Sequence, residues 1–255
     1  MIRLKTKNEI ESLRHSGAIL ARLLDLLKRN ARVGISTKEL DDIARAFISE
    51  NNARAAFLGY RPEGACKPYP AAICASVNNV VVHGTPDSYS LKEGDLLKID
   101  TGVVFEDMIT DAAITVGIGR ISKSARHLMD ATYMALQDAI KTVKIGSCVG
   151  DIGYAVARRA KKEGFYVLKE LTGHGVGYEL HEDPVIFNFG HKGEGAILRE
   201  GAVIAIEPMF STTSEFVVQN KDESYSAYGG GLTAHFEHTI AITKKGAEIL
   251  TQLNE

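Results

Sequence analysis

Cysteine is scarce in this sequence, and the three cysteines present are an odd number without the close spacing of a metal knuckle: Cys66, Cys74 and Cys148. Disulfide-rich domains and structural zinc sites need paired or clustered cysteines. Both classes are therefore excluded. We expect the three thiols to be reduced and mostly buried.

Long apolar runs and an excess of positive charge are also missing. The N-terminus starts with a charged segment instead of the apolar core of a signal peptide, and no run of about eighteen apolar residues follows. The formal net charge is −2, without the Lys/Arg-rich tract typical of nucleic-acid binding. We therefore expect a cytoplasmic protein that binds neither membranes nor nucleic acid directly.

Helical periodicity occurs in two separated pairs of segments. Residues 7–28 predict one helix, and a second begins after Ser36, the expected N-cap, with Glu39 at the capping-box position. Residues 125–143 and 149–163 predict a second pair. Strands follow both pairs, so the order repeats. A repeat of this length indicates a duplicated α+β fold with pseudo-twofold symmetry and a site where the halves meet.

Acidic residues also repeat, in matching positions. The apolar strand KEGDLLKID ends in Asp100, and REGAVIAIE ends in Glu207 in the same register. Farther along, Asp111 opens the predicted strand DAAITV, and Glu237 opens EHTIAI. A turn near Glu106 is expected to pair the first two strands as a hairpin, which brings Asp100 and Asp111 onto one face.

Four carboxylates on apolar strands need positive charge nearby to compensate their negative charge. A single acidic residue usually faces water. Four at matching positions indicate burial, and clustered buried carboxylates raise one another's pKa unless opposite charge is present. Two divalent metal ions would balance the four charges, so the sequence predicts a metal site.

Two histidines stand in positions suited to a reaction centre. His174 lies between glycines in GHGVG, where small neighbours let backbone and ligand approach closely, and His181 follows seven residues later. For His83, in VVVHG, a structural and a functional role are equally supported. An ordinary hydrogen-bonded or surface role is expected for the others: His15, His127, His191, His235 and His238.

Four short motifs carry a resemblance that runs through essentially the whole chain. They are SVNNVVVHGTP around His83, GHG at His174 with His181 after it, IEPM at Glu207 and FEHT at Glu237. Together they resemble the type I methionine aminopeptidases. The resemblance implies the pseudo-symmetric α+β "pita-bread" fold. It also implies that residues 1–255 form a single catalytic domain, with its two halves meeting near residue 120.

The resemblance implies a dinuclear metal site. Its ligands would be Asp100, Asp111, His174, Glu207 and Glu237, with Asp111 and Glu237 bridging both ions. Oxygen donors with one nitrogen and no thiolate suit Mn²⁺, Fe²⁺ or Co²⁺ better than structural zinc.

The implied activity is removal of the initiator methionine from peptides and nascent chains. Glu207 would take the proton of a water held between the ions, and His181 would stabilise the tetrahedral oxyanion. His83 would contact the scissile amide on its leaving side. Tyr69 and Cys74 fall where the family places residues of the methionine pocket.

Two departures from the family's pattern concern this pocket. Leu180 stands where many members have an aromatic residue. Tryptophan, which relatives often carry near residues 216–231, is absent from the sequence. The loops at residues 59–70 and 221–231 are expected to face the substrate.

Other functions stay open at this point. Prolidases and Xaa-Pro aminopeptidases resemble the same fold and share five ligands, but they usually carry a sizeable extra N-terminal domain, whereas the helices here begin by Lys7. The stretch from His181 to Glu237 is too short for the helical insertion of type II methionine aminopeptidases. An inactive peptide-binding module would have lost ligands that are all present here. We expect a monomer, and transient contact with the ribosome is left open.

Overall fold

The computed structural model describes residues 1–61 and 64–253 as two pairs of helices combined with several small antiparallel sheets. The helices are α1 (Lys7–Asn30), α2 (Thr37–Glu50), α3 (Lys123–Ile140) and α4 (Val149–Glu163). The strands are β1 (Arg54–Ala55), β2 (Cys74–Val77), β3 (Val80–Val82), β4 (Leu96–Phe105), β5 (Met108–Gly117), β6 (Tyr166–Val167), β7 (Thr172–Gly175), β8 (Glu182–Phe187), β9 (Val203–Ile206), β10 (Met209–Ser211), β11 (Val217–Gln219), β12 (Tyr225–Ala227), β13 (Thr233–His235), β14 (His238–Thr243) and β15 (Gly246–Ile249).

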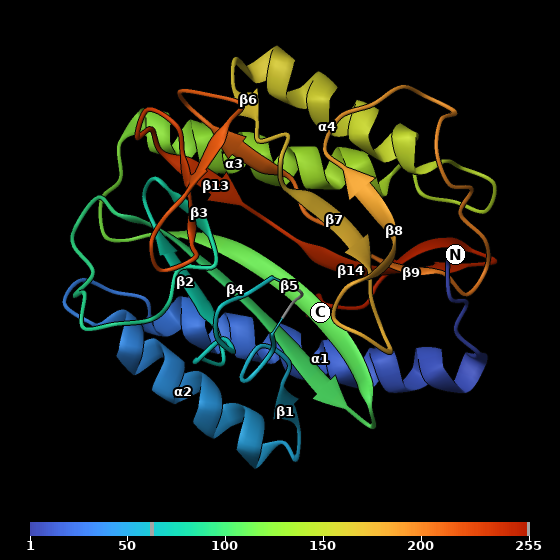
Figure 1. Ribbon diagram of the computed structural model, residues 1–255, viewed down its shortest axis with the longest axis horizontal. Coiled ribbons are helices and arrows are strands. Elements are labelled where there is room, and N and C mark those ends of the chain that lie inside the picture. Colours follow the sequence, from blue (N-terminus) through green and yellow to red (C-terminus); the bar gives the residue numbers. More distant parts are fainter. Residues whose placement is uncertain (62–63, 254–255) are drawn as a thin grey trace.

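Helices lie on the outside and strands lie between them. Figure 1 shows α1 and α2 along one side of the molecule and α3 and α4 along the opposite side. In the first half, β4 pairs with β1, β2 and β5. In the second half the sheet order is β15-β14-β9-β7-β8. Two three-stranded sheets, β13-β10-β6 and β11-β12-β3, complete the fold.

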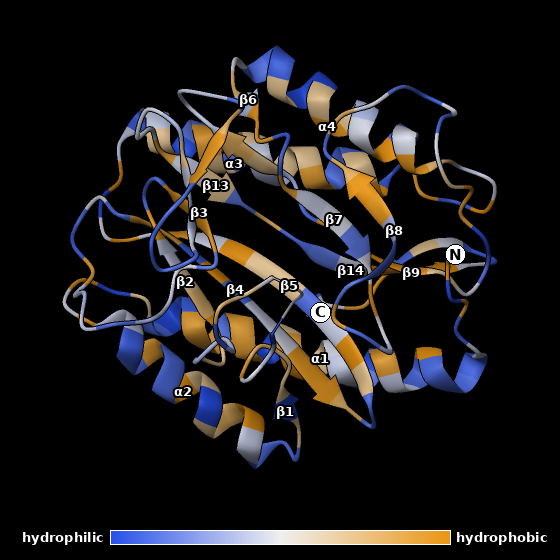
Figure 2. Ribbon diagram, in the orientation of Figure 1, coloured by the Kyte–Doolittle hydropathy of each residue, from blue (hydrophilic) through white to orange (hydrophobic). Residues whose placement is uncertain are grey.

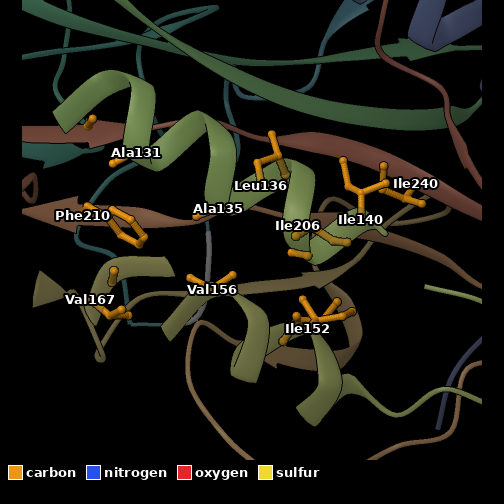
Figure 3. Close-up of a cluster of buried hydrophobic side chains, with 14 of the residues drawn as sticks. Ala131, Ala135, Leu136, Ile140, Ile152, Val156, Val167, Ile206, Phe210 and Ile240 are labelled. Carbon is orange, nitrogen blue, oxygen red and sulfur yellow. The ribbon is translucent and has the colours of Figure 1, made fainter. Parts of the chain in front are cut away.

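Two large hydrophobic clusters hold the helix pairs against the strands. One contains buried residues between Ile19 and Ile118, and the other contains Leu96 with buried residues between Ala125 and Ile242. Figure 2 shows hydrophobic residues concentrated along β4 and β5. Figure 3 shows side chains from α3, α4 and the neighbouring strands meeting in the second cluster, among them Leu136, Ile140, Ile152, Val156, Ile206, Phe210 and Ile240. Removal of this much apolar surface from water is the main force that stabilises such a layered fold.

The internal repeat is visible in local backbone geometry. Ser36 caps α2, its hydroxyl accepting from the Glu39 amide, and the Glu39 carboxylate accepts from the Ser36 amide in return, as expected. At the equivalent place before α4, Asp151 accepts from the Cys148 amide. Residue 36 bridges residue 90 in the first half, and residue 148 bridges residue 197 in the second. The predicted helix pairs and the duplicated α+β architecture are confirmed.

The strand limits differ from the prediction. Asp100 does not end its strand, because β4 continues to Phe105, and Asp111 does not open its strand, because β5 begins at Met108. The turn expected near Glu106 is present, and both its residues have positive φ. Such φ values suit the tight turn of a twisted two-stranded hairpin. The hairpin therefore extends farther toward its turn than the apolar pattern suggested.

Two smaller expectations also need correction. Of the three free thiols only Cys74 is buried; Cys148 is partly buried and Cys66 is exposed. Residues 225–227 of the expected second loop form β12, which pairs with β3. Residues 62 and 63 of the expected first loop lie outside the described residues. No helix of the described part of the chain is long and apolar enough to cross a membrane.

Candidate metal centre

Carboxylate-bearing strands from the two halves meet along β5 and β14. The Asp111 amide donates to Thr239 Oγ1 over 2.9 Å, and the same hydroxyl donates to the Asp111 carbonyl over 2.7 Å. The Glu237 amide donates to the carbonyl of Ala113 over 2.9 Å. These bonds fix Asp111 beside Glu237 although the two are far apart in the sequence.

All five sequence-predicted ligands converge on one cleft of about 1130 Å³. His174 Nε2 lies 3.4 Å from Glu207 Oε1 and 3.9 Å from Asp111 Oδ2. Ligand atoms of Asp111, His174 and Glu237 lie within 4.8 Å of one another. On the hairpin, Gly102 faces Asp111, so Asp100 stands two residues away on the same face of the sheet.

The electrostatics of this cluster are those of uncompensated negative charge. Each of the four carboxylates is at most 9% exposed. In the described part of the chain, their ion-pair contacts are all with histidine. Burial raises the pKa of Asp111 to about 7. Burial and the neighbouring carboxylates also raise the pKa of Asp100, Glu207 and Glu237 well above the usual range.

These residues fit a divalent metal ion. Three buried carboxylate oxygens find no hydrogen-bond partner among the described residues: Asp100 Oδ1, Asp111 Oδ1 and Glu237 Oε1. Burial also lowers the pKa of His174 to about 3, with repulsion from His181 adding to the effect, so its imidazole is neutral and able to ligate. Buried unpartnered oxygens are costly, and a cation would satisfy them.

The glycines that flank His174 allow close backbone contact on both sides. A Cβ at Gly173 would lie 2.4 Å from the Ala205 carbonyl oxygen, and one at Gly175 would lie 2.1 Å from that of Asp183. Strand β7 is thereby able to lie against both β8 and β9. The two glycines therefore allow the close strand packing that positions the His174 ring.

Gly175→Ala tests this packing. We expect the variant to lose roughly 1–3 kcal/mol of stability, the usual cost of overpacking, because a backbone carbonyl cannot move as a flexible side chain would. Thermal unfolding of the metal-free protein measures the effect. The comparison variant is Gly193→Ala, whose Cβ would meet nothing within 4 Å and whose cost comes only from its φ of +78°. A Gly175→Ala variant no less stable than Gly193→Ala would contradict the argument.

His181 is held in place by its neighbours on both sides. The Tyr60 hydroxyl lies 2.7 Å from His181 Nδ1. The Glu182 carboxylate accepts from the amides of Tyr178 and Glu179 and forms a buried ion pair with Lys5 Nζ at 2.7 Å. His181 is open to the cleft, yet limited hydration there lowers its pKa to about 4. Sequence reasoning missed both Tyr60 and the Lys5 contact.

An apolar side pocket adjoins the cluster. Phe57, Cys74 and Leu180 are buried together, with Tyr60 and Tyr69 packed against them, and all five line the cleft. The structure thus brings together Tyr69 and Cys74, as the sequence predicted. Leu180, the noted departure from the family's aromatic residue, is buried in this cluster.

His83 lies in the same cleft, with φ of +60°, and its ring meets that of Tyr225 edge-on. Among the remaining histidines, His235 departs from the expected ordinary role. It is 1% exposed, and its Nε2 lies 3.4 Å from Glu207 Oε2. The only sequence signal for it is its spacing of two residues from Glu237, which places both on the same side of an extended chain. His127 and His238 instead have hydrogen-bond partners of their own, Glu163 and Thr251.

Comparison with known proteins identifies this architecture. Residues 11–244 match metallopeptidase family M24. The methionine aminopeptidase of Aquifex aeolicus is 43% identical over 258 residues, which is 99% of both chains. The crystal structure of a methionine aminopeptidase from Thermotoga maritima superposes with a TM-score of 0.95 at 38% identity, covering 99% of this chain and all of that one.

A more distant structure shares only the fold. The prolidase from Pyrococcus horikoshii superposes with a TM-score of 0.76 at 22% identity, and this chain covers 64% of it. The chain belongs to the methionine aminopeptidases of metallopeptidase family M24. The predicted fold class and the predicted enzyme class, a metallo-exopeptidase, are confirmed. As a metallopeptidase it depends on divalent metal.

Proposed function

We propose that this protein hydrolyses the first peptide bond of peptides and nascent chains that begin with methionine. One observation carries the proposal: four buried carboxylates and one neutral imidazole converge on a cleft that also contains an apolar side pocket. The relatives named methionine aminopeptidase support the same substrate.

We propose that two divalent ions, Mn²⁺, Fe²⁺ or Co²⁺, bind in this cleft. Asp100, Asp111, His174, Glu207 and Glu237 would hold them, with Asp111 and Glu237 shared between both. When bound, such a pair of ions acidifies water and polarises a carbonyl. The donor set supports this choice, because carboxylate oxygens and one imidazole suit these metals.

Glu207 acts as the general base. Its carboxylate lines the cleft and lies beside His174, and an ionised carboxylate is one of the groups that accept protons in such reactions. It takes the proton of the attacking water as the bond to the scissile carbonyl carbon forms. The proton then passes to the leaving amine when the peptide bond breaks.

His181 stabilises the oxyanion of the tetrahedral intermediate. The Tyr60 hydroxyl lies 2.7 Å from Nδ1. In the tautomer that this role requires, the hydroxyl donates to Nδ1 and the ring proton stands on Nε2 as a hydrogen-bond donor. His83 contacts the scissile amide on the leaving side. The free α-amine of the substrate lies against the metal-binding carboxylates, so only the first peptide bond reaches the reacting groups.

Methionine is the side chain that suits the adjoining pocket. Phe57, Tyr60, Tyr69, Cys74 and Leu180 form an apolar wall of the cleft. Burial raises the pKa of Cys74 well above its usual value, so its thiol stays neutral. An unbranched thioether adapts to such irregular apolar walls.

His181→Ala separates transition-state stabilisation from substrate binding. We expect kcat to fall about 10²–10³-fold, the usual loss for one oxyanion donor, with little change in KM. Steady-state kinetics on a Met-Ala-Ser peptide measure both constants, and His127→Ala, on the outer helix α3, is the control. A change confined to KM would instead assign His181 to substrate positioning.

Release of methionine from Met-Ala-Ser with Mn²⁺ or Co²⁺ tests the proposed function directly. A chelator-treated sample and an Ala-Pro-Ala peptide are the controls. Metal-dependent cleavage of the methionine peptide alone is expected. Cleavage of only the proline peptide would favour a prolidase-like activity, and metal binding without cleavage of either would favour a peptide-binding role.

We further propose that residues 1–255 act as a single catalytic domain whose halves meet near residue 120, which the two main hydrophobic clusters support. The monomeric state, the cytoplasmic location and transient contact with the ribosome stay predictions.

A further inference from the structure

His235 lies behind the metal-binding carboxylates, outside the residues that line the cleft. It ends β13, is 1% exposed, and turns its ring toward Glu207 and Glu237. His235 Nε2 is 3.4 Å from Glu207 Oε2 and 3.9 Å from Glu237 Oε2. Atoms of these three residues lie within 4.8 Å of one another. The ring therefore approaches the two carboxylates from outside the cleft.

The backbone of His235 is fixed independently of any metal. Thr115 Oγ1 donates to the His235 carbonyl over 2.7 Å, and the His235 amide donates back to Thr115 Oγ1 over 2.9 Å. On its other side β13 pairs with β10, which places His235 opposite Met209. Anchoring on both sides defines where the ring can point.

Both ring nitrogens of His235 are buried, and neither has a hydrogen-bond partner among the described residues. Buried polar groups are rarely left unpaired, because each one costs about 1–3 kcal/mol. The nearest acceptor to Nε2 is Glu207 Oε2, a few tenths of an ångström beyond hydrogen-bond length. A small rotation of the carboxylate completes this bond.

Glu207 thus stands between two imidazoles. Its Oε1 lies 3.4 Å from His174 Nε2, and its Oε2 lies 3.4 Å from His235 Nε2. His174 lines the cleft and His235 does not. One carboxylate oxygen therefore faces the cleft, and the other faces a donor fixed in the protein.

We propose that His235 is a positioning residue of the metal centre, which donates Nε2–H to Glu207 Oε2 and so directs Oε1 toward His174 and the bound ion. This inference rests on the proposed function of Glu207. Outer partners of metal ligands commonly contribute about 10–100-fold in metal affinity or activity. Loss of the His235 donor frees the Glu207 carboxylate to rotate and weakens metal binding.

Calorimetric titration of the metal-stripped full-length protein with Mn²⁺ tests the inference, with kcat and KM for Met-Ala-Ser as a second readout. His235→Leu removes the donor but keeps an apolar side chain in the space. We expect its Mn²⁺ affinity to fall about 10–100-fold and its kcat to fall more than KM rises. His235→Gln, which keeps an N–H donor, restores most of the affinity.

His238→Leu is the matched control. It removes a histidine adjacent to Glu237 whose Nδ1 contacts Thr251 instead of the carboxylates, and Mn²⁺ affinity near the parent value is expected. The inference is overturned if His235→Leu binds Mn²⁺ as tightly as the parent, or if His235→Gln loses as much affinity as His235→Leu in folded protein. If the parent protein binds Mn²⁺ but cleaves no peptide, the proposed function is wrong. The Mn²⁺ affinities of the variants then still test the role of His235.

Discussion

Glu207→Gln is expected to lower kcat by about 10²–10⁴-fold, the range that a general base contributes. Glutamine has nearly the same shape as glutamate, so the variant keeps the packing of the site and one oxygen toward His174. It cannot accept the proton of the attacking water. Steady-state kinetics on Met-Ala-Ser, with bound metal measured in the same samples, give the result.

Two comparisons separate this effect from a general loss of the site. Glu163→Gln changes a carboxylate at the end of α4, where it contacts His127 and Arg159, and activity close to the parent is expected. A Glu207→Gln variant that retains bound metal and near-parental turnover would remove Glu207 from the role of base. A variant that loses metal as well as turnover would assign Glu207 mainly to metal binding.

Metal removal is expected to abolish activity and to lower the melting temperature. At a free metal concentration of one hundred times Kd, bound metal stabilises the folded state by about 2.7 kcal/mol. For a chain of this size, 1 kcal/mol corresponds to about 2–4 °C in Tm, so stripping is expected to lower Tm by about 5–10 °C. Calorimetric scans of Mn²⁺-loaded and stripped protein measure the difference. An unchanged Tm after demonstrated metal loss would argue against a shared site for these carboxylates.

The pH dependence of the stripped protein gives a further check on the same carboxylates. Their pKa values are raised in the folded state, to about 7 for Asp111, so the folded state binds protons that the unfolded state has already released. Stability from a raised pKa is present at low pH and is lost as pH rises through the folded-state value. The histidines whose pKa values are lowered, among them His174, His181, His235 and His238, act in the opposite sense below about pH 6.5, the usual histidine value. Tm of the stripped protein should therefore fall between about pH 7 and about pH 9, where the histidines are neutral in both states. A rise in Tm over this range would contradict the burial of these acids as a cluster.

Features that are local or repeated can be predicted from the amino-acid sequence alone. Ser36 with Glu39 marks a helix start through bonds within four residues, and apolar periodicity marks each helix without reference to the rest of the chain. The matched acids, Asp100 with Glu207 and Asp111 with Glu237, point to a shared site because only a compensated cluster makes four such residues tolerable on apolar strands. Four short motifs taken together, around His83, His174, Glu207 and Glu237, indicate the family, which the relatives confirm.

The identity of the other residues around that site follows from how distant parts of the chain pack together. His235 carries no motif, and its approach to Glu207 depends on the bond between Thr115 and β13, two segments from different halves. Tyr60 contacts His181, and Lys5 contacts Glu182, although the partners are 121 and 177 residues apart in the sequence. Strand pairing and burial between distant segments create these contacts, and no local pattern records which distant side chain will fill a given space.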